Sequence, residues 1–365
     1  MNRVMDAQLY EALMAFPFPG EVVGAISYGS GHVHETYCVH VHGANQVCTQ
    51  FILQKLNTTA FKKPVELMEN ITLVTDFLRQ QALDKGEDPD LYLTVIRTKD
   101  KTSFYQDSEG EYWRLYPFIT NSISYDRIKS PAHFYESAKA FGNFQKQLAA
   151  FDASRLHATI ERFHDTRHRL ELLDLAIENN YAGRLDEVEA EIKFINEKRH
   201  YGSYLRDLYD KGYLPLRVTH NDTKLNNVLF DRDTGKAIAV IDLDTVMPGL
   251  SAYDFGDSIR FGCTQADEDE KDLSKIRFDQ ALYDVFCKGF MEGVDGALTR
   301  KEIEVLPWGA YIMTYEVGVR FLTDYLDGDK YFHIARPEHN LDRCRTQLKF
   351  LEEMERNWDQ MQIRV

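Results

Sequence analysis

The sequence has 365 residues, 44% of them hydrophobic, and a formal net charge of −15 at pH 7. This length exceeds what one simple core needs and favours two domains or lobes. The negative net charge argues against nucleic acid and against an anionic membrane surface as the main partner, because both are bound by positively charged surfaces. The scattered cysteines form no C-x-x-C pair, and no apolar run is long enough for a signal peptide or a membrane span. We therefore expect a cytoplasmic protein with reduced thiols, which we take to be a monomer.

Short apolar segments separated by turns dominate the first 120 residues. They predict a helix over residues 6–16, strands over 22–26, 33–41 and 47–56, a helix over 62–83, and strands over 91–97 and 111–119. Gly29 and Gly31, in the turn between the first two strands, would let backbone N–H groups approach a phosphate. A plain hairpin turn explains the same two glycines.

Helical periodicity follows, and we place the lobe boundary at this change, with an N-terminal lobe of residues 1–120 and a C-terminal lobe of residues 121–365. Ser130 and Pro131 predict a helix start, with serine as the N-cap and proline at the first position. Further helices are expected over residues 159–179, 184–211, 278–294, 300–326 and 338–360.

Three charged or titratable residues in these helices need an explanation. His164 and His168 stand four residues apart, as a metal pair could, but no third ligand is evident, so we favour a surface or structural role. Arg320 stands among apolar neighbours. A partly buried guanidinium needs a partner, for which we name Asp324 and Glu316.

The polar stretch at residues 217–262 carries the candidate chemistry. Asp222 follows an apolar lead-in, and Asn227 comes five residues later. Asp242 and Asp244 follow a turn and a second apolar strand. Mg²⁺ prefers hard oxygen ligands, usually one or two carboxylates together with substrate phosphates, which Asn227 and Asp242 can supply with the help of Asp244. Asp222 then stays available to take or orient the proton of an acceptor hydroxyl, and Lys224 can offset charge on a transferring phosphoryl group.

This division of labour is that of kinase-type phosphoryl transfer, in which a catalytic-loop aspartate and asparagine are followed, after a strand, by a metal-binding aspartate. It predicts ATP and Mg²⁺ as cofactors. The competing interpretation is a polar loop of capping aspartates and turn asparagines. We favour the catalytic interpretation because three roles recur at the right spacing with strands between them.

The same stretch resembles the aminoglycoside phosphotransferase and choline kinase superfamily, whose members are relatives of protein kinases that phosphorylate small molecules. The resemblance rests on Arg217-Val-Thr-His-Asn-Asp-Thr-Lys-Leu-Asn-Asn227, Ile241-Asp-Leu-Asp-Thr245 and Asp254-Phe-Gly-Asp257. Further segments, among them Tyr28-Gly-x-Gly-His32, Phe163-His-Asp-Thr166 and Arg320-Phe-Leu322, resemble the N-acetylhexosamine 1-kinases along nearly the whole chain. The resemblance implies an α+β, two-lobed protein-kinase-like fold, with a small antiparallel-sheet N-lobe and a larger, mainly helical C-lobe.

The resemblance also implies roles on the acceptor side and beneath the catalytic loop. His32 would lie near the sugar, and Arg320 with Tyr331 beside it would grip substrate hydroxyls or an acetamido oxygen. Asp254 would hydrogen-bond the catalytic loop from below.

On the nucleotide side, Gly29 and Gly31 would cover the phosphates. Gln54 falls where kinases carry a phosphate-binding lysine, and Lys55 beside it is the other candidate, since only one of two successive side chains points inward. Tyr116 and Phe118 lie in the hinge segment, which would bond adenine through backbone groups.

The implied function is ATP- and Mg-dependent phosphorylation of the anomeric hydroxyl of N-acetylhexosamines (GlcNAc or GalNAc) to sugar 1-phosphates. One alternative is a kinase of another small acceptor such as choline, homoserine or an aminoglycoside. The acidic composition suits such cationic acceptors slightly better. Another alternative is a nucleotide-binding regulator without turnover, which the missing lysine suggests.

Overall fold

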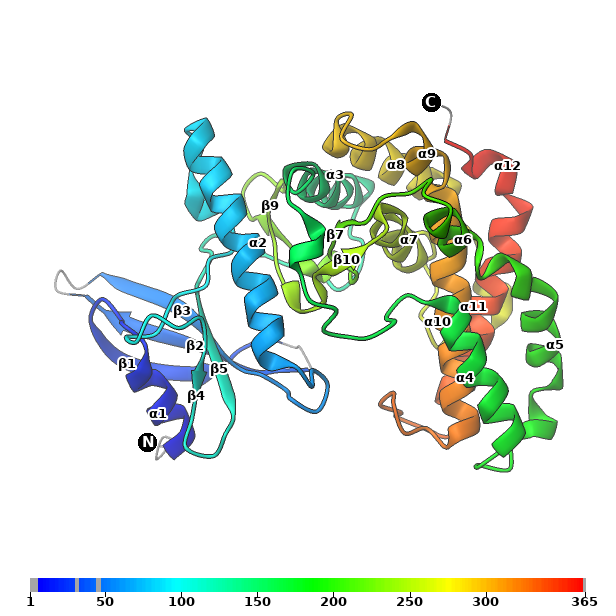
Figure 1. The fold of residues 1–365 in the computed structure, drawn as a ribbon, viewed down its shortest axis with the longest axis horizontal. Coiled ribbons are helices and arrows are strands. Elements are labelled where there is room, and N and C mark those ends of the chain that lie inside the picture. Colours follow the sequence, from blue (N-terminus) through cyan, green and yellow to red (C-terminus); the bar gives the residue numbers. More distant parts are fainter. Residues whose placement is uncertain (1–5, 30–32, 44–46, 364–365) are drawn as a thin grey trace.

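The computed structural model describes residues 6–29, 33–43 and 47–363. An antiparallel sheet of five strands comes first in the chain, in the order β1-β2-β3-β5-β4 (Figure 1). Its strands are β1 (Glu21–Ser27), β2 (Glu35–His42), β3 (Cys48–Lys55), β4 (Tyr105–Gln106) and β5 (Tyr112–Pro117). The short helix α1 (Ala7–Ala15) buries Leu9 and Leu13 against Val39, Leu53 and Leu115 of the sheet. One face of the sheet is therefore closed by α1. The other face, which we call the cleft face, carries Arg114, whose side chain reaches Asp244 in the second half of the chain.

The long helix α2 (Pro64–Lys85), between β3 and β4 in the chain, lies between the sheet and the remaining elements in Figure 1. Its first residue is proline, and it ends at Gly86 in the left-handed conformation, as helix ends often do. Its apolar stripe, including Met68 and Ile71, belongs to one core with Phe144 and Val246 from the second half of the molecule. Burial across this helix therefore ties the sheet to the catalytic region.

Helices make up most of the remaining chain. They are α3 (Pro131–Gln147), α4 (Thr166–Asn179), α5 (Glu189–Lys198), α6 (Tyr204–Asp210), α7 (Ser251–Gly262), α8 (Gln280–Val294), α9 (Arg300–Glu304), α10 (Leu306–Asp327), α11 (His339–Arg356) and α12 (Trp358–Met361). Almost every side chain of α10 is buried, because α4, α7 and α11 surround it. The backbones of α7 and α10 touch at Gly256, where an added Cβ would lie 2.3 Å from the carbonyl oxygen of Gly309.

Two small sheets, one of two strands and one of three, lie between the large sheet and the helices (Figure 1). In one, β7 (Arg217–Thr219) pairs with β10 (Met247–Gly249). In the other, β8 (Val228–Asp231) pairs with β9 (Ala237–Val240) and with β6 (Ser122–Ile123). The segments between these strands, residues 220–227 and 241–246, therefore come together although they are distant in sequence.

Several predicted elements differ from the structure. Residues 91–97 form no regular strand, because Tyr92, Leu93 and Val95 pack on the core beneath α2, and the segment contributes a single bridge at Ile96. The helix predicted from residue 159 begins only at Thr166, where the side chain of Asp165 caps it.

Two longer predicted helices are interrupted. The one at residues 184–211 is broken into α5, α6 and short 3₁₀ turns. The one at residues 300–326 divides at Val305, two residues before Pro307, which cannot continue a helix begun upstream. Within the described ranges, no helix is both long and apolar enough to cross a membrane.

Candidate functional site

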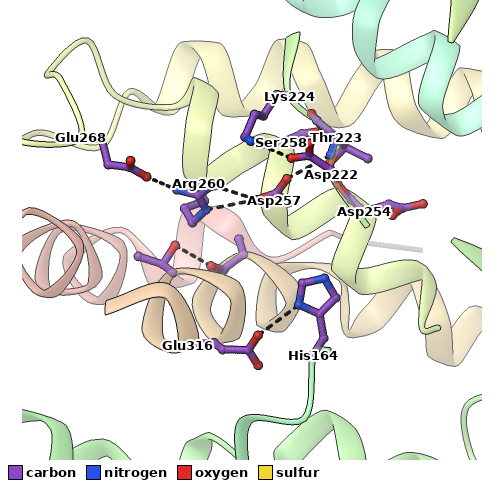
Figure 2. Close-up of polar contacts among 12 residues, drawn as sticks. His164, Asp222, Thr223, Lys224, Asp254, Asp257, Ser258, Arg260, Glu268 and Glu316 are labelled. Atoms are coloured by element: carbon purple, nitrogen blue, oxygen red, sulfur yellow. Dashed lines mark hydrogen bonds and ion pairs between the residues drawn. The ribbon is translucent and has the colours of Figure 1, made fainter. Parts of the chain in front are cut away.

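The predicted catalytic loop, residues 220–227, follows β7 and holds Asp222 from two sides. The ammonium of Lys224 lies 2.9 Å from Oδ1 of Asp222 (Figure 2). The side-chain amide of Asn227 donates to Oδ2 at 3.2 Å and to the Asp222 carbonyl at 2.8 Å. The Asp222 side chain nevertheless keeps 28% of its surface exposed. It is thus a fixed carboxylate that a ligand can reach.

Buried groups support this loop from beneath. The carboxylate of Asp254 accepts the backbone N–H groups of His220 at 3.0 Å and Asn221 at 2.8 Å, which confirms its predicted supporting position. The ring of His220 donates from Nε2 to the Ile241 carbonyl at 2.9 Å, because a carbonyl can only accept. Its Nδ1 then accepts the N–H of Asp222 at 3.3 Å. His220 therefore joins the two segments through both of its ring nitrogens.

A layer of paired charges lies beside the loop (Figure 2). Asp257 accepts the N–H of Thr223 at 3.0 Å and an N–H from Arg260 at 3.0 Å, and Arg260 also reaches Glu268 at 2.9 Å. Burial alone would raise the pKa of Asp257, but the positive charges of Arg260 and Lys224 lower it below its usual value. Burial alone would lower the pKa of Lys224, but Asp222 and Asp257 raise it. Lys224 therefore carries its positive charge at neutral pH.

Asp242 and Asp244 follow β9, and their environments differ. The backbone of Asp242 is left-handed, with φ 61°, a strained conformation typical of functional sites. Asp242 is exposed to solvent. Partial removal from water, with the negative charges of Asp244 and Asp222, raises its pKa well above the usual value.

Asp244 is buried and fully engaged. Its carboxylate accepts both terminal nitrogens of Arg114 and, at 2.9 Å, Nε2 of His34. Burial alone would raise the pKa of Asp244, but Arg114 and His34 lower it well below the usual value. This geometry does not favour the predicted role of Asp244 as an additional metal ligand.

The remaining donors fit a magnesium site. Asp242 and Asn227 offer hard oxygen atoms, and the negative charge of Asp222 near Asp242 would favour a cation there. Among the residues that the structure describes, no group of three or more His, Cys, Asp or Glu side chains could hold a metal. Magnesium does not need one, because phosphates and water usually complete its shell.

The predicted nucleotide contacts lie on the sheet. Gly29 has φ 84°, a conformation that favours glycine, whereas Gly31 and His32 fall outside the described residues. Tyr116 is buried on β5, with its ring 5.2 Å from the guanidinium of Arg114. The N–H of Phe118 already donates to a carbonyl of β3 at 3.1 Å.

Alternation along β3 separates Gln54 from Lys55. The ammonium of Lys55 lies 3.3 Å from the side chain of Gln8, which belongs to α1, and 3.4 Å from Glu35. The side chain of Gln54 points to the opposite face, where its Oε1 accepts Nε of Arg114 at 2.9 Å. This corrects the expectation for Lys55, which faces α1 and not the cleft.

Arg320 and Tyr331, the two predicted acceptor contacts, meet in the structure. A terminal nitrogen of Arg320 donates to the hydroxyl of Tyr331 at 3.4 Å. Its guanidinium lies 5.3–5.8 Å from the ring centres of Phe163, Tyr331 and Phe332. Tyr331 is 71% exposed, whereas Arg320 is partly buried.

The two acids named as partners of Arg320 serve other groups. Asp324 accepts backbone N–H groups of residues 330–332. Glu316 is fully buried and hydrogen-bonded to Nδ1 of His164 at 3.1 Å, beneath the catalytic loop (Figure 2). Burial alone would raise the pKa of Glu316, but His164 lowers it, with help from Arg169 and Arg320. Within the described chain, Arg320 forms no ion pair.

Sequence analysis missed two of these contributors. Arg114 lies in a predicted strand. Its charge, on the same face of that strand as Tyr116, was the feature that could have indicated a role in the site. The pairing of His164 with Glu316 joins residues 152 positions apart and left no local signal. The structural role favoured for His164 agrees with its burial in this pair.

A cavity of about 700 Å³ opens behind the catalytic loop. Its lining includes Thr223, Leu225 and Arg260, together with the start of α3 and the end of α7. Neither Asp222 nor Asp242 is among the described residues that line it, so we do not assign the reacting groups to this cavity.

Comparison with solved structures finds the same fold over nearly the whole chain. A spectinomycin phosphotransferase in complex with ADP and spectinomycin has a TM-score of 0.58 at 14% identity, covering 96% of this chain and 100% of that chain. An amicoumacin kinase in complex with AMP-PNP and Ca²⁺ has a TM-score of 0.59 at 10% identity, covering 93% and 92%. A choline kinase from Cryptosporidium parvum Iowa II has a TM-score of 0.51 at 16% identity, covering 92% and 90%. These likenesses confirm the predicted protein-kinase-like fold.

The model of the phosphotransferase enzyme family matches residues 66–284, which is more than half of the chain. The matched region includes α2, the catalytic loop and the acids after β9. The chain therefore belongs to the phosphotransferase enzyme family.

Proposed function

We propose that the protein transfers the γ-phosphoryl group of ATP to the anomeric hydroxyl of an N-acetylhexosamine, GlcNAc or GalNAc, and so forms the sugar 1-phosphate. The observation that carries phosphoryl transfer is the placement of Asp222, an accessible carboxylate fixed by Lys224 and Asn227. The nucleotide would lie between the sheet of the N-terminal lobe (residues 1–120) and the helical lobe (residues 121–365).

Asp222 is placed to orient the acceptor hydroxyl and to take its proton. The bond between the anomeric oxygen and the γ-phosphorus forms as the bond from that phosphorus to the β,γ-bridging oxygen breaks, and ADP leaves. Lys224 offsets charge on the transferring group, since it is protonated next to Asp222. Asn227 and Asp242 would hold Mg²⁺, which neutralises phosphate charge when bound.

The acceptor side supports a neutral sugar over a cationic acceptor. Arg169 donates to the Phe163 carbonyl at 2.7 Å, and the guanidinium of Arg320 lies 5.8 Å from the centre of the Phe163 ring, so both positive charges lie beside Phe163. Glu316, which is hydrogen-bonded to His164, is one negative charge beside these two positive ones. A choline or aminoglycoside nitrogen would meet net positive charge here. Sugar hydroxyls and an acetamido oxygen would instead accept hydrogen bonds from Arg320.

The acceptor is tested by ATP-to-ADP conversion with Mg²⁺ and a panel of GlcNAc, GalNAc, galactose, glucose, choline, homoserine, kanamycin and no acceptor. Each sugar is also supplied as its 1-O-methyl glycoside. We expect turnover with N-acetylhexosamines that disappears when the anomeric oxygen is blocked. Turnover with choline, homoserine or kanamycin would refute the sugar assignment, and no turnover with any acceptor would favour the regulator.

Asp222→Asn tests the catalytic assignment in the same assay. We expect a loss of ~10²–10⁴ in turnover with ADP binding retained, the range for a positioned base. Asp233→Asn, at an exposed acid in the turn between β8 and β9, is the matched control and should keep wild-type turnover. Near-normal turnover of Asp222→Asn would remove Asp222 from the mechanism.

A further inference from the structure

The cleft face of β3 carries Gln54 where a kinase lysine would hold the nucleotide phosphates, and a different cation lies beside it. We propose that Arg114, on the neighbouring strand β5, supplies the positive charge for the nucleotide phosphates and is positioned by Asp244. This inference rests on the proposed function, because it names a phosphate-binding residue of the same nucleotide site.

The sheet register puts Arg114 next to the missing lysine. Gln54 and Arg114 are direct partners in the antiparallel pairing of β3 with β5, and neighbouring strands lie about 4.8 Å apart. The flanking residues Trp113 and Leu115 point to the α1 side and belong to its core. Arg114 therefore projects from the same face as Gln54, one strand further across.

The guanidinium is held rigidly. Its Nε donates to Gln54 at 2.9 Å, and its two terminal nitrogens donate to the two oxygens of Asp244. His34 completes the arrangement: its Nδ1 accepts the N–H of Asn57 at 3.0 Å, so its Nε2 carries a proton for Asp244. Three of the five N–H groups of Arg114 are used in these bonds, and the other two form no hydrogen bond to the described residues.

The proposed metal ligand belongs to the same segment as the partner of Arg114. Asp242 stands two residues before Asp244, whose carboxylate accepts both terminal nitrogens of Arg114. Phosphate oxygens that share a cation with Asp242 would therefore meet Arg114. An arginine suits this task, because it stays charged and presents a planar fork to phosphate oxygens.

The competing explanation is structural. Arg114 and Asp244 have side chains only 2% and 3% exposed, and they join the sheet to the segment after β9. In that case the pair would serve only to hold these parts together. A buried pair of this kind is costly to break from one side, so a single substitution could unfold the protein for reasons unrelated to phosphate.

The test compares ADP with adenosine, which lacks phosphates, by calorimetric titration of the full chain with Mg²⁺. For Arg114→Met we expect ADP affinity to fall about tenfold or more, as for the loss of a charge-assisted hydrogen bond, while adenosine affinity changes less than about twofold. Arg114→Lys should recover part of the ADP affinity. Lys55→Met is the matched comparison on β3, and a loss of ADP affinity there in place of Arg114 would overturn the assignment.

The double variant Arg114→Met/Asp244→Asn separates the two explanations, since it leaves no unpaired buried charge. We expect its melting temperature to return toward the wild-type value while ADP affinity stays low. If the folded double variant bound ADP as tightly as the wild type does, the inference would be overturned. Failure of the wild-type protein to bind ADP would overturn it as well. The acceptor panel is independent of this result: ADP binding that depends on Arg114, without turnover of any acceptor, refutes the proposed reaction and supports the inference.

Discussion

The carboxylate of Asp254 is the main support of the catalytic loop, and Asp254→Asn changes it by a single atom. In the wild type, Oδ1 accepts the N–H of Asn221, and Oδ2 accepts the N–H of His220 and the side-chain amide of Gln145 at 2.9 Å. All three partners are donors. An asparagine can present one accepting oxygen, so its NH₂ group must face at least one of these donors.

The expected cost follows from this mismatch. One hydrogen bond to a charged acceptor is lost, worth about 1.5–3 kcal/mol, and a buried donor is left unsatisfied, which costs about 1–3 kcal/mol. Burial raises the pKa of Asp254, so the wild-type charge is itself penalised, and a neutral amide recovers part of that penalty. We therefore expect the free energy of unfolding to fall by ~2–4 kcal/mol. The loop that carries Asp222 would shift, and turnover would fall by about 10²-fold.

Urea unfolding followed by tryptophan fluorescence measures the free energy of unfolding, and the assay of ATP-to-ADP conversion measures turnover. Asp272→Asn is the matched control, because Asp272 caps an exposed 3₁₀ turn at Leu273–Lys275 and asparagine caps as well as aspartate. Its unfolding free energy should stay within about 0.5 kcal/mol of wild type. If Asp254→Asn matched this control in both stability and turnover, the supporting role of Asp254 would be refuted.

Three further perturbations test the packing, the electrostatics and the metal site. Gly256→Ala drives a Cβ into the backbone of α10 and should destabilise by about 3 kcal/mol or more in thermal or urea unfolding, whereas Gly24→Ala, with open space around it, should cost under about 1 kcal/mol. Glu302→Gln removes the acid that Arg217 holds through two hydrogen bonds and should destabilise by about 3 kcal/mol at pH 7. Burial alone would raise the pKa of Glu302, but Arg217 lowers it, so this stability is present above the unfolded value of about 4.3. This stability is lost as the pH falls through the lower pKa of Glu302 in the folded protein. If the difference in unfolding free energy between wild type and Glu302→Gln grew toward acid pH, the predicted direction of the pH dependence would be contradicted. Asp242→Asn should weaken ADP binding in Mg²⁺ but not in chelator, and equal weakening in both would remove Asp242 from the metal site.

The sequence by itself determined the parts of the site that are close along the chain. The spacing of Asp222, Asn227 and Asp242 around two apolar strands is enough to bring them together, because a hairpin returns the chain to its starting point. The cap at Ser130 was equally local, and its side chain accepts the N–H of His133 as an N-cap should. These features depend on hydrogen bonds and side-chain periods that act over a few residues.

The tertiary structure decided the rest. Whether Gln54 or Lys55 faces the cleft depends on which face α1 covers, and a shift of one residue exchanges the two faces of a strand. The partner of Asp244 is Arg114, 130 residues away, and no local pattern connects them. Buried charges must find partners wherever the folded chain brings them, so the electrostatic part of this site became visible only once the sheet and the catalytic hairpin were placed against each other.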